Sequence, residues 1–177
     1  MTSSGYTGMK SVPRKKGSPV MIKSPKWLVA VDGSPRSFGL VRHAARRAAE
    51  AGQHPEVLLL HVLPTTGPNE KHTHNVRIVE QLQIKKNLRA AADLMDELCY
   101  GNVHISSLLT VGDVRERIVE TAHRNHSDHI FVGGSSQIGA LRKYVSGSIS
   151  LYVKHQARCP VTVVTEQAPA RKAASAW

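Results

Sequence analysis

The chain is organised around one stretch, Asp128-His129-Ile130-Phe131-Val132-Gly133-Gly134-Ser135, together with the residues that follow it to Gly147-Ser148. The apolar run at its start predicts a buried strand, and Ile149 to Ala157 predicts a helix. Glycines and hydroxyls therefore stand at both ends of a loop between a strand and a helix. Such a loop can hold phosphate, because glycine lets the backbone approach closely and a helix N-terminus offers unpaired N–H groups.

Further apolar runs on both sides of this stretch predict four more strands. Trp27 to Val31 and Val57 to Leu63 are uninterrupted runs of the kind that is covered on both faces. Val103 to Thr110 and Cys159 to Val164 complete the set. Helical patterns lie between the runs, so we expect an α/β fold: a Rossmann-like open five-stranded parallel sheet with helices on both faces.

The first predicted helix has clear boundaries. Ser34-Pro35 is a helix-start signal, and Gly52 is a stop signal. Arg42 and Arg46 fall outside its apolar stripe. We assign them to a solvated face rather than to a nucleic-acid groove, because no aromatic or Asn/Gln set accompanies them.

The other helices and one histidine complete the expected scaffold. Val76 to Leu98 predicts a long helix, and Gly112-Asp113 caps the next, which ends near Asn125. His61 lies inside an apolar strand and is expected to be packed or at a pocket edge. Ligands of parallel sheets bind beyond the carboxyl ends of the strands, where Asp32, Val62 and Gly133-Gly134 stand.

Composition predicts one domain with two tails. Lys and Arg number 24 against 13 Asp and Glu, and six of the net +11 charges precede Trp27. We expect residues 1–24 to form a disordered basic tail, 25–166 the domain and 167–177 a flexible C-terminal tail. The basic tail suggests weak attraction to anionic polymers and no more.

The cysteines, the apolar runs and the N-terminal tail indicate the cellular compartment of the protein. The two cysteines make no disulfide framework, which favours a reducing compartment, the cytoplasm. No apolar run is long enough for a membrane span. The acid-free basic tail leaves import into an organelle as the lesser alternative.

The familiar catalytic signatures are missing. The sequence has no GxxxxGK[ST] loop, and no GxGxxG follows the first strand. The histidine groups His72-Thr73-His74 and His123, His126 and His129 are better explained as surface residues than as metal ligands. With no acid, base and nucleophile set in view, we expect no metal and no enzyme, with at most slow incidental ATP hydrolysis.

Taken together, these segments resemble the universal stress protein family in order and spacing, over roughly residues 25–165. One motif alone would be weak, but the ordered set is specific. The matching segments are Lys26 to Ser37, Leu60-His61-Val62, Gly112-Asp113, Asp128 to Ser135, Gly147-Ser148 and Cys159 to Val164.

The resemblance implies an adenine-nucleotide-binding protein of stress response or signalling. Its ligand would be ATP or AMP, with Mg²⁺ as a possible companion, and the protein would form a homodimer through the last strand, Val161–Val164. Asp32 and the main chain of Val62 would lie near the adenine and ribose. The remaining residues implied at the nucleotide are Val31, Gly133, Gly134, Ser135, Gly147, Ser148 and Ile149.

Each of these residues also has an explanation without a ligand. Asp32 would then cap the first helix, and Gly134 and Gly147 would be turn glycines. Val62 belongs to the core in either case, since only its main chain would contact adenine. Ser148 would cap its helix in either case.

One position departs from the family's phosphate signature, G-x2-G-x9-G-[ST]. Gly134 and Gly147-Ser148 match it, but Gln137 takes the place of the middle glycine. If that position needs positive φ, the strain is about 1 kcal/mol, and affinity would fall about tenfold. The alternative function is therefore a nucleotide-free dimeric interaction module of the same fold.

Overall fold

A computed structural model describes residues 23–52, 54–65, 74–134 and 148–165 of the chain. The expected tails, apart from the residues that flank the domain, lie outside the described residues, as do Ser135, Gln137 and Gly147. The elements in chain order are β1 (Lys26–Ala30), α1 (Pro35–Glu50), β2 (Glu56–Leu63), α2 (His74–Leu98), β3 (His104–Val111), α3 (Val114–Arg124), β4 (His129–Gly133), α4 (Ser148–Gln156) and β5 (Val161–Val164).

The strands form one parallel sheet of order β3-β2-β1-β4-β5. From β1 the chain builds outward to β3 and then returns to the other side of β1 for β4 and β5. The strand order therefore reverses between β1 and β4, whose carboxyl ends flank the place where open α/β sheets hold their ligands. The predicted fold class is confirmed.

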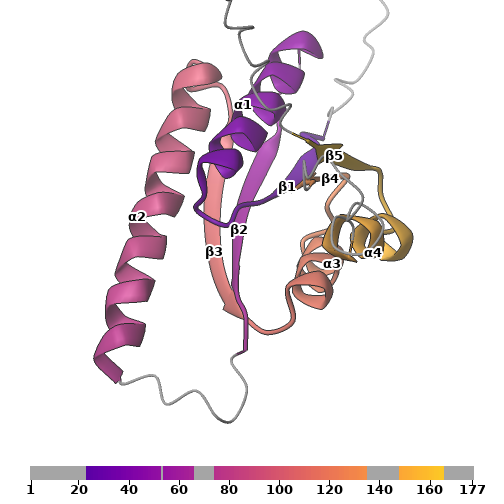
Figure 1. The fold of residues 1–177 in the computed structure, drawn as a ribbon. Coiled ribbons are helices and arrows are strands. Elements are labelled where there is room, and N and C mark those ends of the chain that lie inside the picture. The colour runs from indigo at the N-terminus through magenta and orange to yellow at the C-terminus, as the bar shows by residue number, and fades with distance from the viewer. Residues whose placement is uncertain (1–22, 53, 66–73, 135–147, 166–177) are drawn as a thin grey trace, which may run out of the picture.

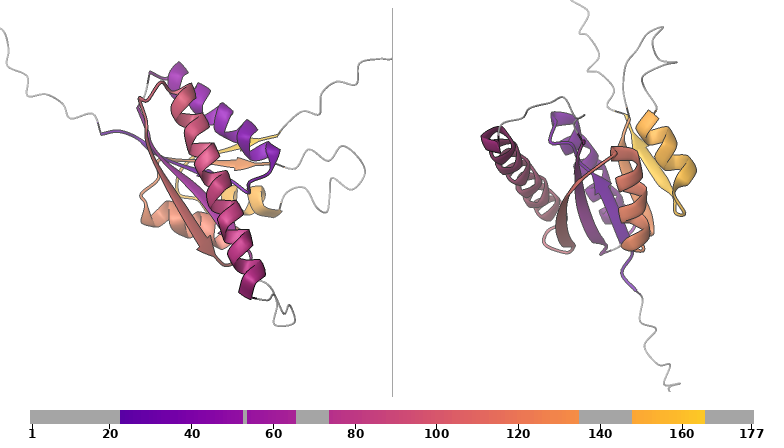
Figure 2. Two further views of the ribbon diagram at one scale, coloured as in Figure 1. Left: turned by 90° about the vertical axis from the view of Figure 1, so that its left-hand side faces the viewer. Right: turned by 90° about the horizontal axis from the view of Figure 1, so that it is seen from below.

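Helices cover both faces of the sheet. Figure 1 shows α1 and α2 on one face and α3 and α4 on the other, and the views in Figure 2 agree. Successive strand residues alternate between the two cores, as the pleat requires. In β1, Trp27 and Val29 pack toward α1 and α2, whereas Leu28 packs toward α3 and α4.

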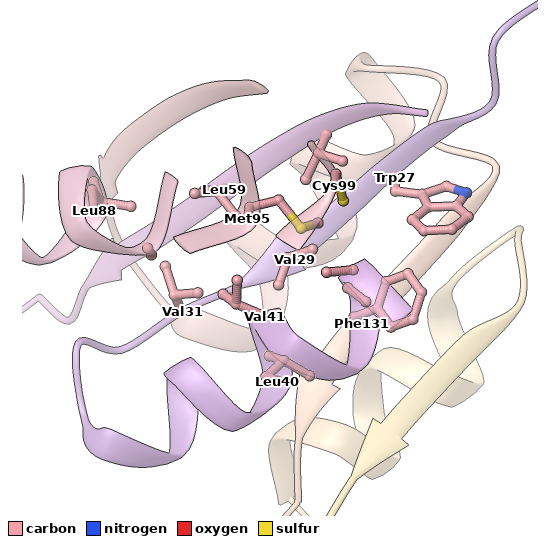
Figure 3. Packing of buried hydrophobic residues seen from close by; sticks show 14 of the residues in the cluster. Trp27, Val29, Val31, Leu40, Val41, Leu59, Leu88, Met95, Cys99 and Phe131 are labelled. Carbon is pink, nitrogen blue, oxygen red and sulfur yellow. The ribbon is translucent and has the colours of Figure 1, made fainter. Parts of the chain in front are cut away.

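The larger core lies beneath α1 and α2. Figure 3 shows Phe131 and Trp27 together at one end of it and Met95 of α2 beside Leu59 of β2. The rings of Trp27 and Phe131 are 5.2 Å apart between centroids, within the usual range for an aromatic pair. This packing fixes α1 against the sheet and so places one wall of the site.

The helix boundaries follow the local sequence signals. Ser34 is the N-cap residue of α1 and Pro35 its first helical residue, although the Ser34 side chain makes no capping hydrogen bond. Gly52 follows the C-cap with a φ of +57°, the conformation that glycine adopts most easily. Asp113 caps α3 by accepting hydrogen bonds from the backbone N–H groups of Arg115 and Glu116.

Two strands differ from the apolar runs that predicted them: β1 is shifted by one residue, and β5 is shorter. β1 ends at Ala30 rather than Val31, although the Val31 N–H still donates to the Leu60 carbonyl at 2.8 Å. β5 begins at Val161 rather than Cys159, because Pro160 has no N–H for the ladder and contributes only its carbonyl, which accepts from Ile130. None of the described helices is both long and apolar enough to cross a membrane.

Candidate functional site

A cavity of about 880 Å³ lies at the carboxyl ends of β1, β2 and β4. Its lining comes from the turn after β1, from one side of α1, from the starts of α3 and α4, and from Val164 at the end of β5. Its volume is within the range of small-molecule sites. The cavity therefore occupies the switch point that the sheet order defines.

Asp32 lies in the turn between β1 and α1 and stabilises this turn by hydrogen bonds. Its carboxylate accepts hydrogen bonds from the Ser34 N–H at 2.9 Å and from the Ser37 hydroxyl, and that hydroxyl also accepts from the Asp32 N–H. The helix cap is Ser34, so the expectation that Asp32 itself caps α1 in the absence of a ligand is wrong. Asp32 lies two residues before this N-cap and stabilises the turn through its hydrogen bonds with Ser34 and Ser37.

The environment of Asp32 also determines its charge. Burial raises the pKa of the carboxyl, but the hydrogen bonds from Ser34 and Ser37 outweigh burial and hold the pKa below its usual value. Asp32 is therefore a carboxylate at neutral pH. It can accept further hydrogen bonds, for example from hydroxyl groups of a ligand.

Gly33 lets the turn after β1 pass close to α2. Its φ is +77°, and an added Cβ would come within 2.5 Å of the Asn87 side-chain nitrogen. Any larger residue would be strained at this positive φ, and the Asn87 amide would have to move aside. The position of Asp32 beside the cavity thus depends on a glycine next to it.

Gly133 and Gly134, at the end of β4, line the part of the cavity that lies beside α1 and β5. The Gly134 N–H donates to the Val164 carbonyl at 2.8 Å, which ties this end of β4 to β5. An added Cβ at Gly134 would lie 2.6 Å from Thr165 Cγ2 and 2.8 Å from Val163 Cγ1. At Gly133 an added Cβ would meet no atom within 4 Å, although Gly133 lines the cavity.

The structure brings most of the predicted site residues to this one cavity. Ser148 opens α4 as expected, and its side chain lies outside the description. Ser135 and Gly147 also lie outside the described residues. The predicted residues that line the cavity are Val31, Asp32, Val62, Gly133, Gly134 and Ile149.

His61 is a lining residue with a buried polar atom. Its side chain is 8% exposed, and within the described residues its Nδ1 has no hydrogen-bond partner. Burial lowers the pKa of the imidazole, against the opposing effects of the Val31 backbone and of the Asp32 and Glu80 carboxylates. The expected place at a pocket edge agrees with this position, and we expect a neutral ring at neutral pH.

Three arginines of α1 are among the lining residues that the sequence pattern did not identify. Arg42 and Arg46 are exposed, as their place outside the apolar stripe predicts, yet both line the cavity together with Arg36. Helical periodicity separates buried from exposed positions, but it does not say what an exposed side chain faces. The tertiary arrangement supplies that information.

The histidines show no metal-binding arrangement among the described residues, where no group of three or more His, Cys, Asp or Glu side chains converges. His129 instead makes a 2.8 Å hydrogen bond with the Thr162 hydroxyl of β5. It also stacks near Phe131, at 4.6 Å between ring centroids. These contacts give His129 a structural role between β4 and β5.

Fold and site together define an open parallel α/β protein with a ligand cavity at its topological switch point. The profile of the Universal stress protein family matches residues 25–165, and the chain belongs to this family. The resemblance noted in the sequence is thereby confirmed. A search of curated proteins finds no significant match.

Solved structures of the family share the fold at low sequence identity. A universal stress protein in complex with cAMP has a TM-score of 0.63 at 21% identity, with 79% of this chain and 96% of that chain covered. The Archaeoglobus fulgidus protein in complex with dAMP has a TM-score of 0.56 at 23% identity, covering 81% and 98%. An Arabidopsis thaliana family protein with AMP bound has a TM-score of 0.55 at 17% identity, covering 81% and 93%.

Proposed function

We propose that this protein binds an adenine nucleotide in the cavity at the switch point and serves in stress response or signalling. The observation that carries the proposal is the convergence of Asp32, Val62, Gly133 and Gly134 on one cavity from three separate strand ends. The cAMP, dAMP and AMP bound to structures of the same family support it.

In this proposal each lining residue contacts the part of the nucleotide that suits its chemistry. The Asp32 carboxylate accepts hydrogen bonds from the ribose hydroxyls, and the main chain of Val62 meets the adenine edge. The first turn of α4, with Ser148 and Ile149, offers backbone N–H groups to phosphate, as helix N-termini do. Gly133 leaves the space that the ligand fills. ATP and AMP are both candidates, with Mg²⁺ as companion of the triphosphate.

We further propose that binding, rather than turnover, is the function. Asp32 is the one carboxylate among the described lining residues, and its Oδ1 already accepts hydrogen bonds from the Ser34 N–H and the Ser37 hydroxyl. A carboxylate held ionised in this way is a poor general base. Hydrolysis of ATP would then be slow and incidental, and the cytoplasm is the proposed compartment.

Ligand-dependent thermal unfolding tests the proposal. A ligand at about 100 times its Kd stabilises a protein by about 2.7 kcal/mol, which raises Tm by several degrees in a domain of this size. We expect AMP or ATP at millimolar concentration to raise Tm, and equal concentrations of inorganic phosphate to raise it less. An unchanged Tm with both nucleotides would contradict nucleotide binding.

Gln137 favours a second candidate, a nucleotide-free dimeric interaction module. Here the middle glycine of the phosphate signature is replaced, and this residue lies outside the described part of the chain. This alternative predicts that Gln137→Gly creates or strengthens ATP binding. Tight binding by the wild type, unchanged in Gln137→Gly, would remove its basis.

A further inference from the structure

The lining of the cavity is unevenly charged. Arg36, Arg42 and Arg46 all line it, whereas the carboxylate of Asp32 is the one acidic group among the described lining residues. Asp32 is engaged with Ser34 and Ser37 and makes no ion pair with these arginines. The cavity is therefore cationic, and its positive charge is concentrated on α1.

Arg42 and Arg46 form a pair one helical turn apart. Residues at this spacing project from the same side of a helix, so both arginines lie on the side of α1 that lines the cavity. Arg36 lies in the first turn of α1, about 15 Å along the axis from Arg46, and belongs to another part of the wall.

The pair is available to a ligand. Within the described residues Arg42 makes no ion pair. Arg46 has two long, exposed contacts, one with Glu50 at 3.7 Å and one between its Nη2 and His43 Nδ1 at 3.4 Å. Exposed contacts of this kind are weak, so an anion in the cavity can compete with Glu50 for Arg46. Guanidinium groups bind phosphate oxygens through paired hydrogen bonds.

The pair also reaches the cavity from the side opposite to α4. α1 packs on one face of the sheet and α4 on the other, so their groups approach the ligand from different directions (Figure 1). A single phosphate at the first turn of α4 does not need the arginines. An anionic chain that extends away from α4 would meet them.

We propose that Arg42 and Arg46 bind the outer phosphates of a nucleoside polyphosphate and so make this chain prefer adenine nucleotides with more phosphates. The inference rests on the proposed function and assigns a specificity role to two residues of α1. Each charge-assisted contact that is lost should lower affinity for the triphosphate about tenfold. Affinity for the monophosphate should stay within about twofold.

Calorimetric titration with AMP, ADP and ATP in magnesium-free buffer tests this. The variants are Arg42→Gln, Arg46→Gln and the double variant, and the control is Arg47→Gln. Arg47 is on the same helix and exposed but does not line the cavity, so the control makes the same charge change elsewhere. Glutamine is a good helix former, and circular dichroism checks that α1 is kept.

The expected result is tighter binding from AMP through ADP to ATP in the wild type and in Arg47→Gln, with the difference largely lost in the double variant. Equal wild-type affinities for AMP and ATP would overturn the inference and leave the proposed function intact. So would an unchanged ratio of ATP to AMP affinity in the double variant. If the wild type binds none of the three nucleotides, the proposed function fails and the inference fails with it.

Discussion

Gly133 and Gly134 are adjacent in sequence but have different reasons to be glycine. A side chain at Gly134 would run into Thr165 and Val163, so this glycine is required by the packing of β4 against β5. A Cβ added at Gly133, which lines the cavity, would meet no atom within 4 Å. We therefore propose that Gly133 leaves room for the ligand, whereas Gly134 is required by the fold.

Gly133→Val should separate binding from folding. We expect valine to occupy the space of the ligand and abolish nucleotide binding. The free energy of unfolding should stay within about 0.5 kcal/mol of the wild type, since valine suits a strand and its Cβ would meet no atom within 4 Å. Urea denaturation and a nucleotide titration measure the two effects. Full binding by a folded Gly133→Val protein would show that the ligand does not lie against Gly133.

Gly134→Ala, by contrast, should lower the stability of the fold. The added methyl group forces both Thr165 and Val163 to move, and we expect a loss of about 1–3 kcal/mol in the free energy of unfolding. Urea denaturation beside the wild type measures it. If the variant is as stable as the wild type, the side chains at the end of β5 can move aside without a loss of stability.

At the scale of the element, α3 depends on a charged cap. Asp113 accepts hydrogen bonds from the N–H groups of Arg115 and Glu116, and the Arg115 guanidinium donates to it at 2.9 Å. The hydrogen bond from the Arg115 side chain is the largest cause that lowers the pKa of Asp113 from 3.8 to about 2. A lowered carboxyl pKa stabilises the folded state above the unfolded value and ceases to do so as the pH falls through the folded value.

Asp113→Asn tests the charge without removing the cap, because asparagine caps helices as well as aspartate does. We expect the variant to unfold at lower urea than the wild type at neutral pH. The difference should shrink as the pH is lowered from 3.8 to about 2, where the wild-type carboxyl becomes protonated. A difference that is the same at both ends of this range would contradict the account.

The helices and strands were easier to predict from the sequence than the residues that their packing brings to the cavity. Buried strands such as β2 read as apolar runs, and caps such as Asp113 are local signals, so both were visible in single stretches. The position of Arg42 and Arg46 at the cavity was not visible, since it depends on how α1 packs over β4. Similarly, nothing in the run around His61 shows that its Nδ1 is left without a partner in the described structure.

At the scale of the whole molecule, β5 is one of the two edge strands of the sheet that the described residues form. Val163 is 37% exposed on this last strand, and unpaired edge strands are natural sites for pairing with another chain. We propose that two copies pair through Val161–Val164, as the family resemblance implies. The strand order, which creates this edge, follows from long-range pairing that no single stretch of sequence specifies.

Val163→Lys should give a monomer. A charged side chain on the edge strand opposes pairing with a second copy, and Val163, at 37% exposed, is not one of the buried core residues. Size-exclusion chromatography with light scattering measures the mass, and circular dichroism checks the fold. A wild type that is monomeric at all concentrations, or a folded variant that stays dimeric, would place the dimer contact elsewhere or remove it.

The central claim is that the cavity at the end of β1, β2 and β4 holds an adenine nucleotide. Isothermal titration of the wild-type protein and of Gly133→Val with ATP and AMP tests it most directly. We predict saturable binding to one site per chain in the wild type and none in the folded variant. No heat from the wild type at millimolar nucleotide, or equal binding by both proteins, would contradict the claim.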